Sequence, residues 1–120
     1  LIAYPSMSGA MQKARRSEAL VAIAQVQLAQ ERWRSNSGRY ATLSELGLPD
    51  TAPGGHYRIV VGEATPLGYT AHAQASGGQA ADRACRHLKL AFESGNAVYS
   101  SGETEAASND AATNRQCWKL

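Results

Sequence analysis

The chain has 120 residues, of which 43% are hydrophobic, and carries a formal net charge of +2 at pH 7. The length suffices for one small domain with a modest core, and the apolar share is too high for a disordered chain. So small a positive charge is weak evidence for a nucleic-acid partner. The uninterrupted apolar stretches of the chain fall far short of the roughly 20 residues of a membrane helix, and no signal-peptide pattern is found. We therefore expect either a soluble chain or a truncated one.

The first long element is a helix, predicted from Ser6 to about Ser35. This segment contains no proline and one glycine, and it is rich in strong helix formers. In its second half, apolar residues recur at three- and four-residue steps and predict a broad buried stripe, made of Ala19, Ala22, Ile23, Val26, Ala29 and Trp33 and widened by Leu20, Ala24 and Leu28. Its first half carries a thinner stripe of Met7, Ala10, Met11 and Ala14. We expect this first half to project from the domain or to dock on a partner.

A helical turn is predicted next. Asn36-Ser37-Gly38 favours the end of the long helix, because Asn and Gly readily adopt the left-handed conformation that closes one. Thr42 and Glu45 have the spacing of a capping box. They predict a short helix over residues 42–46.

Four strands and a polar tail follow. Residues alternate with the period of a half-buried strand at 56–62, 68–75, 87–94 and 97–100. Residues 103–116 are small, polar and aperiodic, which is typical of a surface loop. The sequence therefore predicts an α+β fold, with a helix in residues 1–35 packed on a four-stranded antiparallel sheet in a head of residues 36–120.

Two cysteines, Cys85 and Cys117, suit one disulfide in an oxidising compartment. The alternative is a pair of free thiols in a cytosolic protein. A bond between them would pin the tail to the start of the third strand. It would stabilise the fold by about 3–4 kcal/mol through loop entropy.

The sequence carries no catalytic or metal-binding signature. His56, His72 and His87 are too widely spaced for a zinc site, and we predict that they are exposed to solvent. A nucleophile elbow, a phosphate-binding loop and a pair of carboxylates for acid–base work are not found. We therefore predict no enzymatic activity, no metal and no cofactor.

Basic and aromatic residues allow a nucleic-acid hypothesis. The residues in question are Lys13, Arg15, Arg16, Arg39 and Arg58, with Tyr40, Tyr57, Tyr69 and Trp118 for stacking. The alternative is a solvated helix face and ordinary core aromatics. Composition favours that alternative.

The order of several short motifs resembles that of type IV pilins. AYPS, ARRSEA, LAQERW, SNSGRYAT and LGLP follow one another in the first half of the chain. The spacing of Gln79, Asp82, Cys85, Leu88 and Leu90, with Cys117-Trp118 near the end, is similar to minor pilins of the PilE kind and to the related DNA-uptake pilin ComP. The resemblance implies that residues 85–117 form a disulfide-bounded D-region and that the pilin has no catalytic activity.

The same resemblance implies a location and partners. Such pilins begin with an apolar helix that holds them in the inner membrane and later packs in the fibre, with the head in the periplasm or on the extracellular pilus. Leu1 to Ala3 would then be the last turn of a removed membrane helix. Pro5 would mark a flexible joint in the assembled fibre.

Three functional hypotheses follow. The first is a minor subunit that primes or joins the pilus with other major and minor pilins, and so serves motility, adhesion or DNA uptake; its packing residues would be Met7, Met11, Ala14, Arg15, Arg16 and Glu18. The second is a DNA receptor, with contacts from Arg39, Arg58, Arg115 and Lys119. The third, weaker hypothesis is adhesion through residues 103–116.

Overall fold

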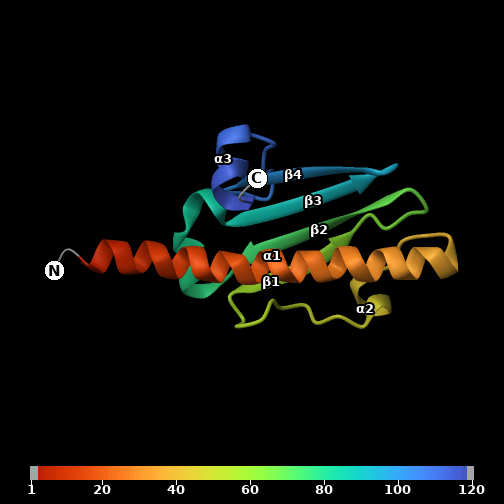
Figure 1. The fold of residues 1–120 in the computed structure, drawn as a ribbon, viewed down its shortest axis with the longest axis horizontal. Helices are drawn as coiled ribbons and strands as arrows, with labels where there is room; N and C mark the ends of the chain where they lie inside the picture. The colour runs from red at the N-terminus through yellow and green to blue at the C-terminus, as the bar shows by residue number, and fades with distance from the viewer. Residues whose placement is uncertain (1–2, 119–120) are drawn as a thin grey trace.

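A long helix lies across one face of a four-stranded antiparallel sheet (Figure 1). The structure is a computed structural model that describes the backbone of residues 3–118 and the side chains of residues 9–118. The sheet order is β1-β2-β3-β4. The elements are α1 (Ala3–Ser37), α2 (Leu43–Leu46), β1 (Tyr57–Gly62), β2 (Gly68–Ala75), the 3-10 helices η1 (Gly77–Ala81) and η2 (Arg83–Cys85), β3 (His87–Glu93), β4 (Asn96–Gly102) and α3 (Ala111–Trp118). The predicted α+β architecture is confirmed.

The core lies between α1 and the sheet. Strand alternation turns Ile59, Ala73 and Leu88 toward the helix, in one row across β1, β2 and β3. Small alanines on β2 let the helix approach closely, and Ile23 and Val26 are almost fully buried against the sheet. Each apolar residue in this layer removes its side chain from water, which is the main favourable contribution to folding. We call this side of the sheet the inner face.

The buried stripe of α1 is narrower than the sequence predicts. Ala19, Ala22, Ile23 and Val26 are buried, but Ala24 is exposed and Leu28 is 55% exposed, so the expected widening by these two is wrong. A flat sheet covers about one third of a helix circumference, and residue 28 is turned about 200° from residue 26. α1 also runs through Pro5. The joint at Pro5 in an assembled fibre stays a prediction.

Gln30 is buried, although its polar side chain does not predict burial from the sequence. Its amide donates to the Ala41 carbonyl at 2.7 Å and accepts from the Ala41 N–H at 2.8 Å. These two bonds hold the chain after α1 against the helix. The capping box beyond it is confirmed, since Thr42 and Glu45 bond each other's backbone at the start of α2.

The tail folds into a helix where the sequence predicts a loop. Asp110 accepts a hydrogen bond from the Thr113 N–H at 2.9 Å, which caps the start of α3 and lowers the pKa of the Asp110 carboxyl. Asn114, Cys117 and Trp118 are buried at helical spacing. The expectation of a loop over all of residues 103–116 is therefore wrong. Three buried residues in eight make too short a pattern to stand out from polar neighbours.

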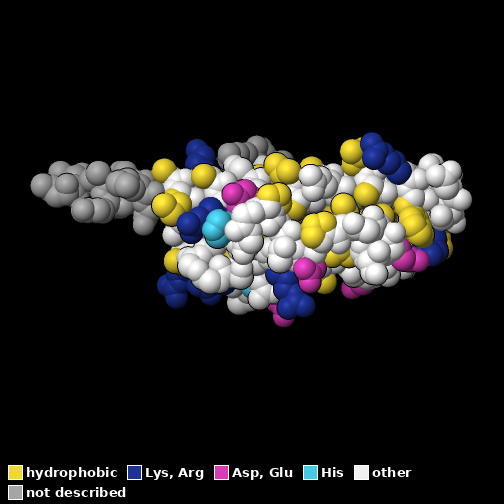
Figure 2. Space-filling model, turned by 90° about the horizontal axis from the view of Figure 1, so that it is seen from below, with side chains coloured by type: hydrophobic (Ala, Val, Ile, Leu, Met, Phe, Trp, Pro, Cys, Tyr) yellow, Lys and Arg dark blue, Asp and Glu magenta, His cyan; other side chains and the backbone are white. Residues whose placement is uncertain are grey.

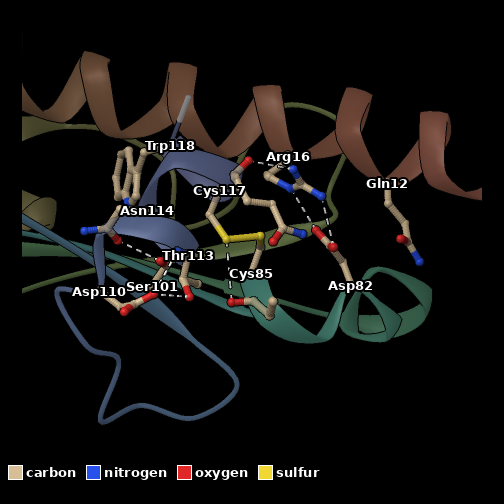
Figure 3. The surroundings of a disulfide bond; sticks show 12 residues. Gln12, Arg16, Asp82, Cys85, Ser101, Asp110, Thr113, Asn114, Cys117 and Trp118 are labelled. Atoms are coloured by element: carbon tan, nitrogen blue, oxygen red, sulfur yellow. Dashed lines mark hydrogen bonds and ion pairs between the residues drawn. A yellow bond between two sulfur atoms is a disulfide. The ribbon is translucent and has the colours of Figure 1, made fainter. Parts of the chain in front are cut away.

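Cys85 and Cys117 form the predicted disulfide, which joins η2 to α3 (Figure 3). Trp118 packs on Tyr99 with ring centroids 4.8 Å apart, and Asn114 accepts from the Ser101 hydroxyl at 2.7 Å. Tyr99 and Ser101 both lie on the inner face. The disulfide and these contacts hold α3 on the same side of the sheet as α1.

A buried ion pair joins α1 to the 3-10 segment. The Arg16 guanidinium donates to both carboxylate oxygens of Asp82, at 2.9 and 3.0 Å, and to the Gln116 carbonyl at 3.1 Å (Figure 3). Beside it, the Gln79 amide donates to the Gln12 carbonyl and to the Tyr57 hydroxyl, both at 2.9 Å. We call these contacts the helix clamp. They tie α1, η1, η2 and α3 together at one place.

The helix clamp predicts a large effect of Asp82→Ala on stability. We expect the free energy of unfolding to fall by about 3 kcal/mol, because the Arg16 guanidinium would stay buried without its carboxylate. The double variant Arg16→Met with Asp82→Leu should recover most of this loss. Urea unfolding with the disulfide intact measures both. Glu45→Gln, in the exposed Arg39–Glu45 pair, is the control and should cost much less. Equal losses in Asp82→Ala and Glu45→Gln would contradict the role of the clamp.

Candidate nucleic-acid interface

The sheet surface turned away from α1 carries most of the polar strand residues, and we call it the outer face. Arg58 on β1, Gln74 on β2 and His87 on β3 form one row across it, and Val60, His72 and Lys89 form the next. Neighbouring strands are about 4.8 Å apart and residues about 3.3 Å apart along each strand. The Cα atoms of Arg58 and Lys89 are therefore about 12 Å from each other.

Several cations on or beside the outer face have no carboxylate partner among the described residues. The ion pairs among the described residues involve Arg16, Arg39 and His56, none of which lies on the outer face. Arg58 is exposed and Lys89 is half-buried, while Arg83 and Arg86 precede β3. Figure 2 shows Lys and Arg side chains, with Asp and Glu side chains beside them, along the lower edge of that view, on the side away from α1. Such unpaired cations on a flat surface can bind phosphate groups.

Two histidines form a buried pair in the middle of the outer face. The His72 Nε2 and His87 Nδ1 atoms are 2.8 Å apart, and the residues are only 9% and 5% exposed. The prediction that these histidines are exposed to solvent is wrong. Each shields the other, since they are diagonal neighbours on β2 and β3. The tail lies against the neighbouring strand: a Cβ on Gly102, opposite His87, would lie 3.3 Å from the Ala107 Cα.

Burial and nearby cations keep this pair uncharged at neutral pH. Burial lowers the pKa of His72 to about 4, with further lowering by His87 and Lys89 against the opposite effect of Glu105. Burial also lowers the pKa of His87, where Glu105 opposes and Lys89 and Arg86 reinforce the shift. The pair is therefore a neutral N–H···N hydrogen bond among positive side chains.

The four residues predicted for DNA contact do not come together. Arg58 lies on the outer face, but Arg39 follows the far end of α1 and forms a two-pronged pair with Glu45 at 2.7 and 3.0 Å, which lowers the pKa of Glu45 to about 2. Arg39 is roughly 30 Å along α1 from the helix clamp. Arg115 is exposed on α3, on the inner side of the sheet, and Lys119 lies outside the described residues. The sequence prediction omits Lys89, which the alternation of β3 places on the same face as Arg58. It also omits Arg86, which precedes β3 and which no strand alternation places on that face.

The predicted subunit-packing residues also differ in their surroundings. Met11 is 50% exposed, Ala14 is exposed and Arg15 is half-buried. Arg16 is engaged in the helix clamp, and the Glu18 carboxylate accepts a hydrogen bond from the His56 Nδ1 atom at 3.0 Å. The side chain of Met7 lies outside the described residues.

Within the described part of the chain, no group of three or more His, Cys, Asp or Glu side chains is arranged to hold a metal ion. Nor does any helix in residues 3–118 have the length and apolarity needed to cross a bilayer.

The lowered pKa of His72 predicts acid sensitivity. In the unfolded chain this imidazole titrates near 6.5, so the unfolded state binds the proton more tightly and stability is lost as the pH falls from 6.5 toward 4. We expect this group to remove about 2 kcal/mol between pH 7 and pH 5. His72→Gln should lose less stability over that interval in urea unfolding, whereas His56→Gln should behave as the unaltered chain. Equal acid losses in His72→Gln and the unaltered chain would contradict the lowered pKa.

The sequence of the chain matches the model of a known protein family. The family model described as type IV minor pilin ComP, DNA uptake sequence receptor, matches residues 5–89, which is more than two thirds of the chain. The match runs from the start of α1 into β3 and includes Arg58, His72, His87 and Lys89. A search of curated proteins finds no match. With its long helix, four-stranded sheet and disulfide-bound tail, the chain belongs to the ComP family of type IV minor pilins.

Proposed function

We propose that this minor pilin binds double-stranded DNA through its outer face and acts as a receptor for DNA uptake. The description of its family names a receptor of that kind. The observation that carries the proposal is the presence of Arg58 and Lys89 on one flat surface without carboxylate partners among the described residues. Family membership also points to an extracellular pilus, where such a surface would meet DNA.

The physical basis of binding is the release of counterions from the phosphate backbone. Each cation that neutralises a phosphate releases condensed ions, so affinity falls as salt rises. Arg58 and Lys89, about 12 Å apart, are spaced to contact different phosphates. Gln74 is exposed between Arg58 and His87 and offers an amide donor and acceptor, the groups that read adenine edges. The cations would thus position the duplex and Gln74 would contact a base.

Substitutions on the outer face should weaken DNA binding in a salt-dependent way. We expect Arg58→Ala and Lys89→Ala each to reduce the slope of log affinity against log salt concentration by about one, because each removes one phosphate contact. Fluorescence anisotropy with a labelled duplex over a range of salt concentrations measures this slope. DNA from the organism that encodes the chain should bind more tightly than foreign DNA of equal length and base composition.

Arg115→Ala is the matched control for this measurement, since it removes an exposed arginine from the other side of the sheet. Its slope should equal that of the unaltered chain. If micromolar protein forms no salt-dependent complex with either DNA, the proposed receptor function is wrong. If only Arg39→Ala and Arg115→Ala weaken binding, the contact lies elsewhere on the molecule.

A second function, fibre packing, is favoured by an exposed apolar stripe on α1. At 100° per residue, Ala14, Val21 and Leu28 lie opposite the stripe that is buried against the sheet. Val21 is 50% exposed and Leu28 is 55% exposed, and exposed Ala10 and Ala24 extend the same line. We propose that helices of neighbouring pilins cover this stripe in the pilus. Roles in motility, adhesion and membrane anchoring before assembly are part of the same proposal.

Val21→Asp should block incorporation into pili without unfolding the chain. An exposed site changes the free energy of unfolding by less than about 0.5 kcal/mol, whereas a buried carboxylate between helices is costly. The measurement is the amount of this chain recovered in sheared pili relative to the cell-bound amount. Val98→Asp, at a 44% exposed valine on β4, is the control and should incorporate normally. Normal incorporation of Val21→Asp would contradict the packing proposal.

A further inference from the structure

The His72–His87 pair is the least expected feature of the outer face. Two ring nitrogens meet at 2.8 Å in a position that is almost fully shielded from water. The contact contributes nothing to the core, which lies on the other side of the sheet. His87 lies in the row of Arg58 and His72 in the row of Lys89, so the pair lies inside the surface proposed to bind DNA.

Charged groups from three parts of the chain face the pair. Lys89, on β3, disfavours a proton on both rings, and Arg86, just before β3, disfavours one on His87. Arg58 on β1 lies in the same row as His87, with Gln74 between them. Glu105, from the tail segment that passes over Gly102, favours a proton on both rings. In the free protein, burial together with Lys89 and Arg86 outweighs this one carboxylate.

The pair can accept one proton without opening. A neutral imidazole donates through one nitrogen and accepts through the other, so a single N–H···N bond joins His72 and His87. When one proton is added, an imidazolium donates to the remaining neutral ring through the same two atoms, and the bond becomes charge-assisted. A second proton would remove the acceptor. The two rings therefore titrate as a unit, and the first proton belongs to the pair.

DNA would reverse the balance of charge around this unit. Phosphates held by Arg58 and Lys89 would bring negative charge to the outer face and offset the cations that exclude the proton. We propose that the His72–His87 pair takes up one proton when the outer face binds DNA, so that binding strengthens as the pH falls below neutrality. This inference rests on the proposed DNA-binding function and assigns to that site a sensitivity to pH.

The expected size of the pH effect on DNA affinity follows from the influence of a nearby opposite charge, which moves the pKa of a group by about 1–3 units. For a shift of about 1.5 units, the affinity for DNA at pH 5.0 should be roughly three- to tenfold higher than at pH 7.5. The slope of log affinity against log salt concentration should also steepen at pH 5.0, by at most about 0.9 for one added charge.

The test compares binding of the 120-residue chain to one duplex at pH 7.5 and pH 5.0. His72→Gln with His87→Gln should lose this gain in affinity, whereas His56→Gln, outside the outer face, should keep it. Proton uptake by the unaltered chain gives a second measurement that needs no variant. Binding enthalpies at pH 5.0 in buffers of different ionisation enthalpy should reveal net uptake, and little should remain at pH 7.5.

The outcomes separate this inference from the function on which it rests. If the chain binds DNA but the double variant keeps the full pH response, or no proton is taken up, the pair has no such role and the DNA-binding proposal stands. If the unaltered chain binds no DNA at either pH, the receptor function fails and this inference with it. A gain at pH 5.0 that is lost only in the double histidine variant supports both.

Discussion

The Arg16–Asp82 ion pair of the helix clamp lies where α1, the 3-10 segment and α3 meet. Arg16 is 7% exposed and Asp82 is 6% exposed, so each charge is compensated almost entirely by the other and by the Gln116 carbonyl. An ion pair this deep adds little net stability over apolar residues of similar size, but losing either partner is costly. Its contribution is therefore positional. It fixes the place where α1 crosses the 3-10 segment and meets α3.

The clamp and the disulfide together determine what the outer face presents. Cys85 is bonded to Cys117, and the next residues are Arg86 and His87, at the start of β3. Holding this turn sets the register in which His87 lies in the row of Gln74 and Arg58. The same bond returns the tail to the sheet, where it crosses Gly102 and brings Glu105 toward the histidines. Contacts on the inner side of the molecule thus help to position the charged residues of the outer face.

Local patterns predict the elements of this fold, but long-range contacts decide the site. The period of the strands and the Thr42–Glu45 capping box are encoded in adjacent residues, and both are confirmed. Other features depend on residues 11 to 66 positions away in the sequence. These are the buried side of α1, the burial of Gln30 and of the two histidines, and the partner of Arg16. The net charge of +2 likewise sums over paired and unpaired cations, so composition understates the positive charge of the outer face.

The most direct test of the central claim, that DNA meets the outer face, is an NMR titration of the ¹⁵N-labelled chain with duplex DNA. We predict that amide signals shift most at Arg58, Gln74, Arg86 and Lys89 and in residues 103–107, while those of α3 and the exposed stripe of α1 stay in place. Shifts confined to α1 or α3, or no shifts at all, would contradict it.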